Sequence, residues 1–163
     1  FLRQILRRLA VTALLAPVAA LGAATMTANP ANAAKASAQA LETQVNKLVN
    51  AERVKHGCSS LKVNTQITKA ARAHSAYMAQ TGKFSHTGKN NSRFSTRIKN
   101  AGYTKPSAEN IAWGYQTASA VVDGWMKSPG HRTNILNCKS KTTGIGIARA
   151  ANGAPYYTQD FGY

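Results

Sequence analysis

The sequence of 163 residues predicts an α+β fold in which helices cover a small, mainly antiparallel sheet. Three observations lead to this prediction. The first half of the chain carries apolar residues at helical spacing. Two segments near the C-terminus have the β-branched and aromatic composition of strands, and a strong turn signal separates them. A short, largely uncharged segment between these two parts suggests a further strand.

Residues 1–33 have the features of a secretory signal peptide. Arg3, Arg7 and Arg8 form a positive n-region, residues 9–24 form an apolar run, and residues 31–33 make an A-x-A cleavage pattern. The adjacent arginines leave the twin-arginine route as an alternative. We therefore expect a secreted, extracellular protein with a linker at residues 34–39 and one small domain at residues 40–163.

Four helices are predicted from the spacing of apolar residues and from capping signals. They cover approximately residues 40–55, 65–80, 94–101 and 119–127. Asn64 is a plausible N-cap of the second helix, and glycines follow the first three helices.

The predicted strands come later in the chain. Residues 143–149 alternate β-branched and small side chains, and residues 156–161 form the second arm of a hairpin around Asn152-Gly153. Residues 108–114 are too short for a helix, so a strand or an extended loop is expected there. Residues 61–63 suggest a short extended link.

The segment from Trp125 to Leu136 joins the last helix to the hairpin. Pro129 and Gly130 predict a turn that reverses the chain, and His131 follows directly. A histidine next to such a turn is expected to point in a fixed direction.

The charge balance is strongly basic, with 21 Lys and Arg, 5 Asp and Glu, and a formal net charge of +16 at pH 7. This favours polyanionic surroundings such as anionic cell-wall polymers. The basic residues are dispersed and form no nucleic-acid-binding motif, so no specific nucleic-acid partner is predicted.

Cys58 and Cys138 make an even pair in a chain expected outside the cell, which predicts one disulfide. A metal-binding or catalytic role of the thiols is the weaker alternative, because neither cysteine lies in a CxxC pair or beside a histidine.

Three polar residues are candidates for a functional site. His86 and His131 follow helix ends in turn-rich segments, where ligands commonly bind. Glu109 is a lone carboxylate in an apolar stretch, so it is either buried with hydrogen-bond partners or lines a cleft. His74 lies on the apolar face of a predicted helix and is interpreted as a core residue. No serine near these segments lies in a GxSxG motif.

Several segments, taken in order, resemble the superfamily of cysteine-rich secretory proteins, antigen 5 and pathogenesis-related proteins (CAP, or SCP domain), in its short bacterial exported form. The segments are LVNAER (48–53), FSHT (84–87), RIKNAGY (97–103), AENIA (108–112), WMKSPGHRTNIL (125–136), GIGIA (144–148) and YTQDFG (157–162). They extend over nearly all of the predicted domain.

The resemblance implies an α-β-α sandwich and a central cleft lined by two histidines and two acidic residues. It assigns His86, His131 and Glu109 to that cleft. The second acidic position, three residues after Trp125, is occupied by Ser128 in this sequence. The resemblance also implies divalent-metal binding by His86 and His131, with zinc as a candidate, which the loss of one carboxylate weakens.

Three functions follow from these observations. A non-enzymatic, monomeric binding module would hold a small apolar or cell-wall-derived ligand in the cleft. A metal-dependent hydrolase would use His86 and His131 on the metal and Glu109 as general base. A scaffold would bind wall polyanions through its basic surface. We favour the first, because no credible nucleophile is present.

Overall fold

The computed structural model describes residues 30–163, so most of the predicted signal peptide lies outside the described residues. The elements are α1 (Pro30–Lys55), β1 (Lys62–Val63), α2 (Thr65–Thr81), the 3-10 helix η1 (Lys89–Asn91), α3 (Phe94–Asn100), β2 (Pro106–Trp113), α4 (Ala118–Lys127), α5 (Pro129–Ile135), β3 (Thr142–Arg149) and β4 (Pro155–Gly162).

The four strands form one sheet in the order β1-β3-β4-β2. β4 lies between β3 and β2 and is antiparallel to both, whereas the two-residue β1 is parallel to β3. The sheet is therefore mainly antiparallel, as predicted, and β2 is one of its edges. In this register Glu109 of β2 lies beside Asp160 of β4.

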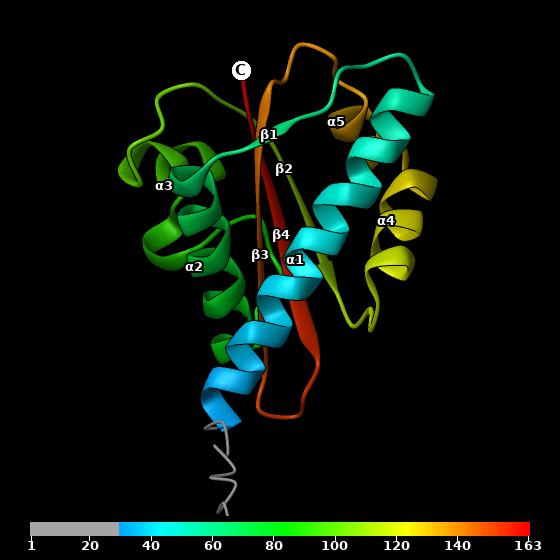
Figure 1. Cartoon of the computed structure of the whole chain (residues 1–163). Helices are drawn as coiled ribbons and strands as arrows, with labels where there is room; N and C mark the ends of the chain where they lie inside the picture. Colours follow the sequence, from blue (N-terminus) through cyan, green and yellow to red (C-terminus); the bar gives the residue numbers. More distant parts are fainter. Residues whose placement is uncertain (1–29) are drawn as a thin grey trace, which may run out of the picture.

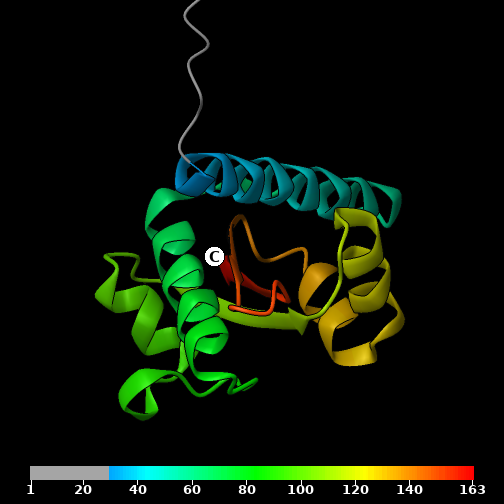
Figure 2. The same cartoon turned by 90° about the horizontal axis from the view of Figure 1, so that it is seen from below.

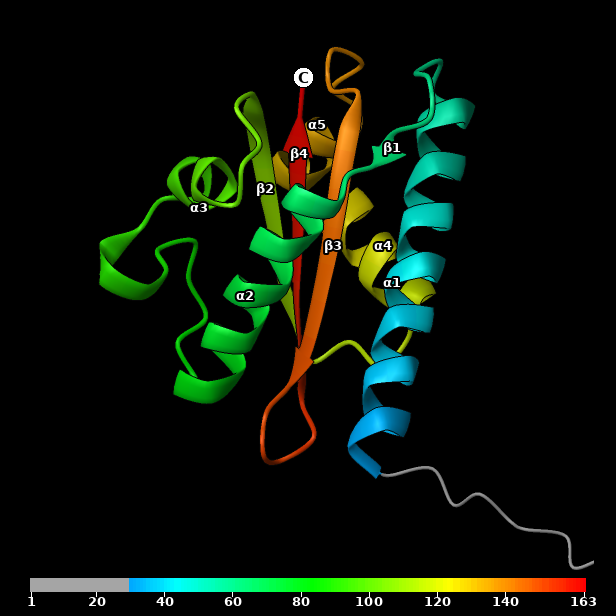
Figure 3. The same cartoon turned by 60° about the vertical axis from the view of Figure 1, so that its left-hand side comes forward.

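Helices cover both faces of the sheet, which confirms the α-β-α sandwich (Figures 1 and 2). α2 packs on β3 and β4, and α3 packs beside it against β2. α4 and α5 lie on the opposite side, while α1 packs on both β3 and α4. Figure 3 shows how the segment between α2 and α3 projects beyond the sheet on the α2 side.

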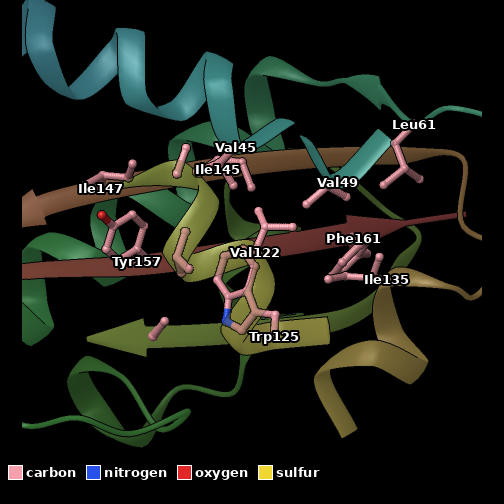
Figure 4. Packing of buried hydrophobic residues seen from close by; sticks show 13 residues of the cluster. Val45, Val49, Leu61, Val122, Trp125, Ile135, Ile145, Ile147, Tyr157 and Phe161 are labelled. Atoms are coloured by element: carbon pink, nitrogen blue, oxygen red, sulfur yellow. The ribbon is translucent and has the colours of Figure 1, made fainter. Parts of the chain in front are cut away.

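The larger hydrophobic core lies between the sheet and α1, α4 and α5 (Figure 4). Trp125 is its largest side chain; it is 1% exposed and donates its indole N–H to the carbonyl of Ile111 at 3.2 Å. This bond attaches α4 to the edge strand β2, so the core also fixes the strand that carries Glu109.

Two glycines allow α2 to approach β3 closely. A Cβ atom at Gly144 would lie 2.2 Å from the backbone N of Thr68, and one at Gly146 would lie 2.1 Å from the backbone N of Arg72. The alternation of small and β-branched residues in β3 therefore has a physical reason. The small residues face the helix α2, and the isoleucines face the larger core.

Helix α1 begins at Pro30, ten residues before the predicted start. Residues 34–39, predicted as a linker, lie within this helix. The prediction gave too little weight to the alanines of this stretch. Alanine has the highest helix propensity of all residues, which favours the longer helix.

The predicted reversing turn at Pro129-Gly130 is wrong. Both residues lie in the first turn of α5, and Gly130 is not among the residues with positive φ. Proline suits this position because its fixed φ is helical and its missing N–H would be unpaired there anyway. His131 is therefore on a short helix and not on a loop.

The predicted disulfide between Cys58 and Cys138 is confirmed, and it joins the segment after α1 to the segment after α5. Arg53 supports the same junction. Its buried guanidinium donates to the carbonyls of Ser59, Ile135, Asn137 and Ser140 at 2.6–3.0 Å. A cation at the carbonyl end of α5 also stabilises that helix.

No helix within residues 30–163 combines the length and apolar character needed to cross a lipid bilayer.

Candidate functional site

Glu109 is the buried centre of the candidate site. It lies on the edge strand β2 and is 5% exposed. One carboxylate oxygen accepts a hydrogen bond from Nδ1 of His86 at 2.8 Å, and the other forms a salt bridge with Nη2 of Arg97. Glu109 is thus a buried carboxylate with partners at the wall of a pocket, which unites the two alternatives left open by the sequence.

His86 lies in the segment after α2, which ends at Gly82 in the left-handed conformation. The bond from Nδ1 to Glu109 orients the ring, and its side chain is 56% exposed. Nη1 of Arg97 donates to the backbone carbonyl of His86 at 3.0 Å. Because Nδ1 donates to the carboxylate, the neutral ring presents Nε2 as an acceptor for a ligand or a water molecule.

His131 lies on α5, which packs against the edge strand β2 on the side opposite to α3 (Figure 2). Its backbone carbonyl accepts a hydrogen bond from the side-chain amide of Asn110 at 3.2 Å. Burial lowers the pKa of His131, and the electrostatic effect of the protonated form of His86 lowers it further. The two histidines are thus close enough to interact electrostatically, but no hydrogen bond joins the His131 ring to Glu109 or His86 among the described residues.

A pocket of about 440 Å³, here called the His86 pocket, opens beside His86 and Glu109. Its volume is within the usual range of small-molecule sites. Phe94 and Ala108 are the apolar residues of its lining. The others are polar or charged: His86, Thr87, Arg93, Ser107, Glu109 and Asn134. His131 is not part of this lining.

Arg97 is the main site residue that the sequence reasoning missed. Its side chain is 10% exposed, and it bonds to Glu109 and to the carbonyls of His86 and Ser92. It therefore fixes the carboxylate and the histidine loop together. The only signal in the sequence was its presence in the RIKNAGY segment, where nothing distinguished it from other helical arginines.

Asp160 of β4 is a second buried carboxyl group, next to Glu109 in the sheet. It is paired with Glu109 across β4 and β2, is 0% exposed, and neither of its side-chain oxygens has a hydrogen-bond partner among the described residues. Burial raises its pKa well above the usual value, and the negative charge of Glu109 raises it further. Burial and the neighbouring carboxylate thus both favour the neutral acid of Asp160 over its carboxylate.

The side chains present do not form a complete zinc site. Zinc in proteins usually has three or four protein ligands. Residues 30–163 contain no group of three or more His, Cys, Asp or Glu side chains placed to hold a metal ion. Ser128, at the second acidic position, is shared by α4 and α5 as a terminal residue. His86 and His131 alone make an insufficient ligand set, so we derive no metal-dependent step.

No activated nucleophile is found among the residues that the structure describes. The hydroxyl of Ser107 bonds to that of Ser140 at 2.9 Å, and the hydroxyl of Ser85 accepts from the backbone N–H of Thr87. Both cysteines are in the disulfide. A serine, threonine or cysteine nucleophile is commonly activated by an adjacent base, and no hydrogen bond joins such a side chain to a His, Asp or Glu side chain in this part of the chain.

The fold and the site together define an α-β-α sandwich with a histidine–glutamate pocket at its sheet edge. The model of the Cysteine-rich secretory protein family (CAP) matches residues 47–161. The chain therefore belongs to the CAP family.

Two proteins of Bacillus subtilis (strain 168) are similar in sequence. YkwD is 37% identical over 134 residues, which cover 82% of this chain and 51% of YkwD. The membrane protein YlbC is 35% identical over 121 residues, which cover 74% of this chain and 34% of YlbC. The chain thus spans about half of one relative and about a third of the other.

Solved structures show the same fold. An extracellular protein containing an SCP domain from Bacillus anthracis has a TM-score of 0.75 and 27% identity; the match covers 82% of this chain and 43% of that chain. An outer surface protein from Borrelia burgdorferi has a TM-score of 0.66 at 18% identity, and the match covers 72% of this chain and 88% of that chain. Structural relatives of this chain are thus extracellular or outer-surface proteins.

Proposed function

We propose that the chain is a secreted, non-enzymatic binding module whose His86 pocket holds a small ligand derived from the cell wall. The observation that supports this most is the fixed arrangement of His86, Glu109 and Arg97 at a pocket in which no described hydroxyl is hydrogen-bonded to a basic side chain. The disulfide and the extracellular relatives support secretion, because disulfides persist in oxidising compartments.

The lining of the pocket favours a polar ligand over an apolar one. Phe94 and Ala108 provide one apolar contact region, while the remaining side chains offer several hydrogen-bond donors and acceptors. An apolar ligand would leave these polar groups unpaired, and each unpaired buried group costs about 1–3 kcal/mol. A fragment with hydroxyl, amide and carboxylate groups would pair with them.

A blocking substitution tests this proposal. Thr87 lines the pocket and is exposed, so Thr87→Trp should fill the entrance without disturbing the core. We expect about a tenfold or greater loss of affinity for a fluorescent disaccharide-peptide fragment of peptidoglycan, measured by anisotropy. The control is Thr104→Trp, at an exposed position that lines none of the four described pockets, which should bind as the unmodified protein does.

The same pair of variants distinguishes an apolar ligand from a wall-derived ligand. If a fatty acid binds in the pocket and the wall fragment does not, the ligand is apolar and the proposal of a wall-derived ligand is wrong. The metal-dependent hydrolase remains the alternative proposal. Zn²⁺ binding in calorimetry that His131→Ala abolishes, together with hydrolysis of the fragment, would favour it.

A further inference from the structure

A second pocket, here called the basic pocket, lies between α2, the 3-10 helix η1 and α3. It has a volume of about 650 Å³. Lys69 of α2, Lys89 of η1, and Arg93 and Arg97 at α3 all line it, together with small residues such as Ala70 and Ala73. We propose that the basic pocket binds the phosphate groups of a linear anionic polymer with an aliphatic backbone. The basic pocket adjoins the His86 pocket, since Arg93 lines both, but the proposal does not depend on the ligand of the His86 pocket.

The charge of the basic pocket is the first argument. Its lining includes four cationic side chains and no acidic residue. Lys69, Lys89 and Arg93 are exposed and take part in none of the salt bridges of the described residues. Cations grouped in a concave site produce a stronger local potential than the same charges dispersed over a surface.

Arg97 provides a second, independent observation. It is the most buried cation of the pocket, with a side chain that is 10% exposed, and its Nε–H has no hydrogen-bond partner among residues 30–163. The other nitrogens of the guanidinium are already bonded to Glu109 and to backbone carbonyls. Arg97 thus adds a positive charge to the pocket wall, and one of its donors has no partner among the described residues.

The shape and composition of the pocket indicate the kind of anion. The four cations come from three elements around the pocket, α2, η1 and α3, and four cations match several anionic groups better than one. Arginine and lysine together favour phosphate, which accepts hydrogen bonds from a planar guanidinium fork and from a point-like ammonium.

The absence of aromatic side chains from the lining argues against nucleic acid. Single-stranded nucleic acids are usually held by bases that stack on aromatic rings. The basic pocket offers instead the methyl groups of Ala70 and Ala73 and the aliphatic stems of its lysines. These surfaces suit a short aliphatic linker between phosphates, and not a planar base.

The test measures binding of a fluorescein-labelled poly(glycerol phosphate) of defined length by anisotropy, with the disulfide-bonded protein. The test variant is Lys69→Gln/Lys89→Gln. The matched control is Lys47→Gln/Lys62→Gln, which removes two exposed lysines that line none of the four described pockets. Thermal unfolding checks that both variants are folded.

We expect the Lys69/Lys89 variant to bind the polymer about tenfold more weakly at low salt, and the control to lose about twofold or less. Inorganic phosphate should compete only at much higher phosphate concentration than the polymer, because it fills one subsite. Thr87→Trp, which blocks the His86 pocket, should leave polymer binding unchanged. The proposal for the basic pocket can therefore fail independently of the proposal for the His86 pocket.

Equal losses in the two lysine variants would overturn the proposal, because the polymer would then bind the basic surface at large. No binding by the unmodified protein at low salt would also overturn it. If an oligonucleotide with the same number of phosphates binds as tightly and through the same lysines, the site belongs to nucleic acid and the assignment to an aliphatic phosphate polymer is wrong.

Discussion

Arg97 determines how the acidic and imidazole groups of the site are held. It neutralises Glu109 and bonds to the carbonyl of His86, whose ring bonds to the same carboxylate. Its partners come from three parts of the chain, and only the fold brings them together. The sequence could identify His86 and Glu109 by their local context, but it could not identify a helical arginine whose role depends on distant partners.

Asp160 provides a prediction about stability and pH. An unperturbed aspartate has a pKa of about 3.9. In the folded protein the pKa is raised, first by burial and then by the charge of Glu109. The stability that the neutral form contributes is fully present below the unfolded pKa, and it is lost as the pH rises through the folded pKa.

Asp160→Asn should therefore raise the free energy of unfolding at pH 8 and have a smaller effect near pH 4, where the folded side chain at this position is uncharged in both proteins. Urea unfolding at the two pH values measures the difference. Asp123→Asn, on the exposed face of α4, is the control and should change stability little at either pH. An equal effect of Asp160→Asn at both pH values would contradict the raised pKa.

At the scale of elements, the contact between α2 and β3 depends on two positions without side chains. The sequence showed small residues alternating with β-branched residues in this strand. It did not show which helix covers them, because strand and helix are brought together only by the sheet order. For helix α5 the sequence was ambiguous, since its Pro-Gly pair is compatible with both a turn and a helix start. In the folded chain these residues form the first turn of the helix.

Gly146→Ala should destabilise the protein by about 3 kcal/mol, because the new methyl group would meet the backbone of α2 and force the helix away. Chemical unfolding measures the loss. Gly130→Ala is the matched control: the structure places nothing within 4 Å of the new Cβ, and the residue is helical. It should be neutral or slightly stabilising, whereas a marked loss would show that Gly130 needs a left-handed conformation after all.

At the scale of the molecule, the disulfide and the buried Arg53 join the end of α1 to the segment that follows α5. The paired cysteines were predicted from their number and the expected compartment. Arg53 was not, because three of its four acceptor carbonyls, those of Ile135, Asn137 and Ser140, are remote in sequence. The two connections close the sandwich at the end opposite the β3–β4 hairpin.

Replacing both cysteines, as Cys58→Ser/Cys138→Ser, should lower the free energy of unfolding by up to about 4–5 kcal/mol, the value that the chain-entropy treatment gives for a cross-link over 80 residues. Guanidinium unfolding with and without a reductant measures this effect. The reductant should destabilise the unmodified protein and leave the double variant unchanged. Unaltered stability of the variant would mean that Arg53 and the core alone hold this junction.

The sequence alone determined the α+β class, most helix and strand positions, the cysteine pair and the three candidate site residues, because these depend on local periodicity, capping and residue chemistry. The tertiary structure decided that His86 and Glu109 are in contact, that Arg97 and Asp160 share their surroundings, and that Gly130 is helical. It also grouped Lys69, Lys89, Arg93 and Arg97 around one pocket. Hydrogen bonds, burial and electrostatic interactions depend on distances between remote segments, and these distances are set only in the folded chain.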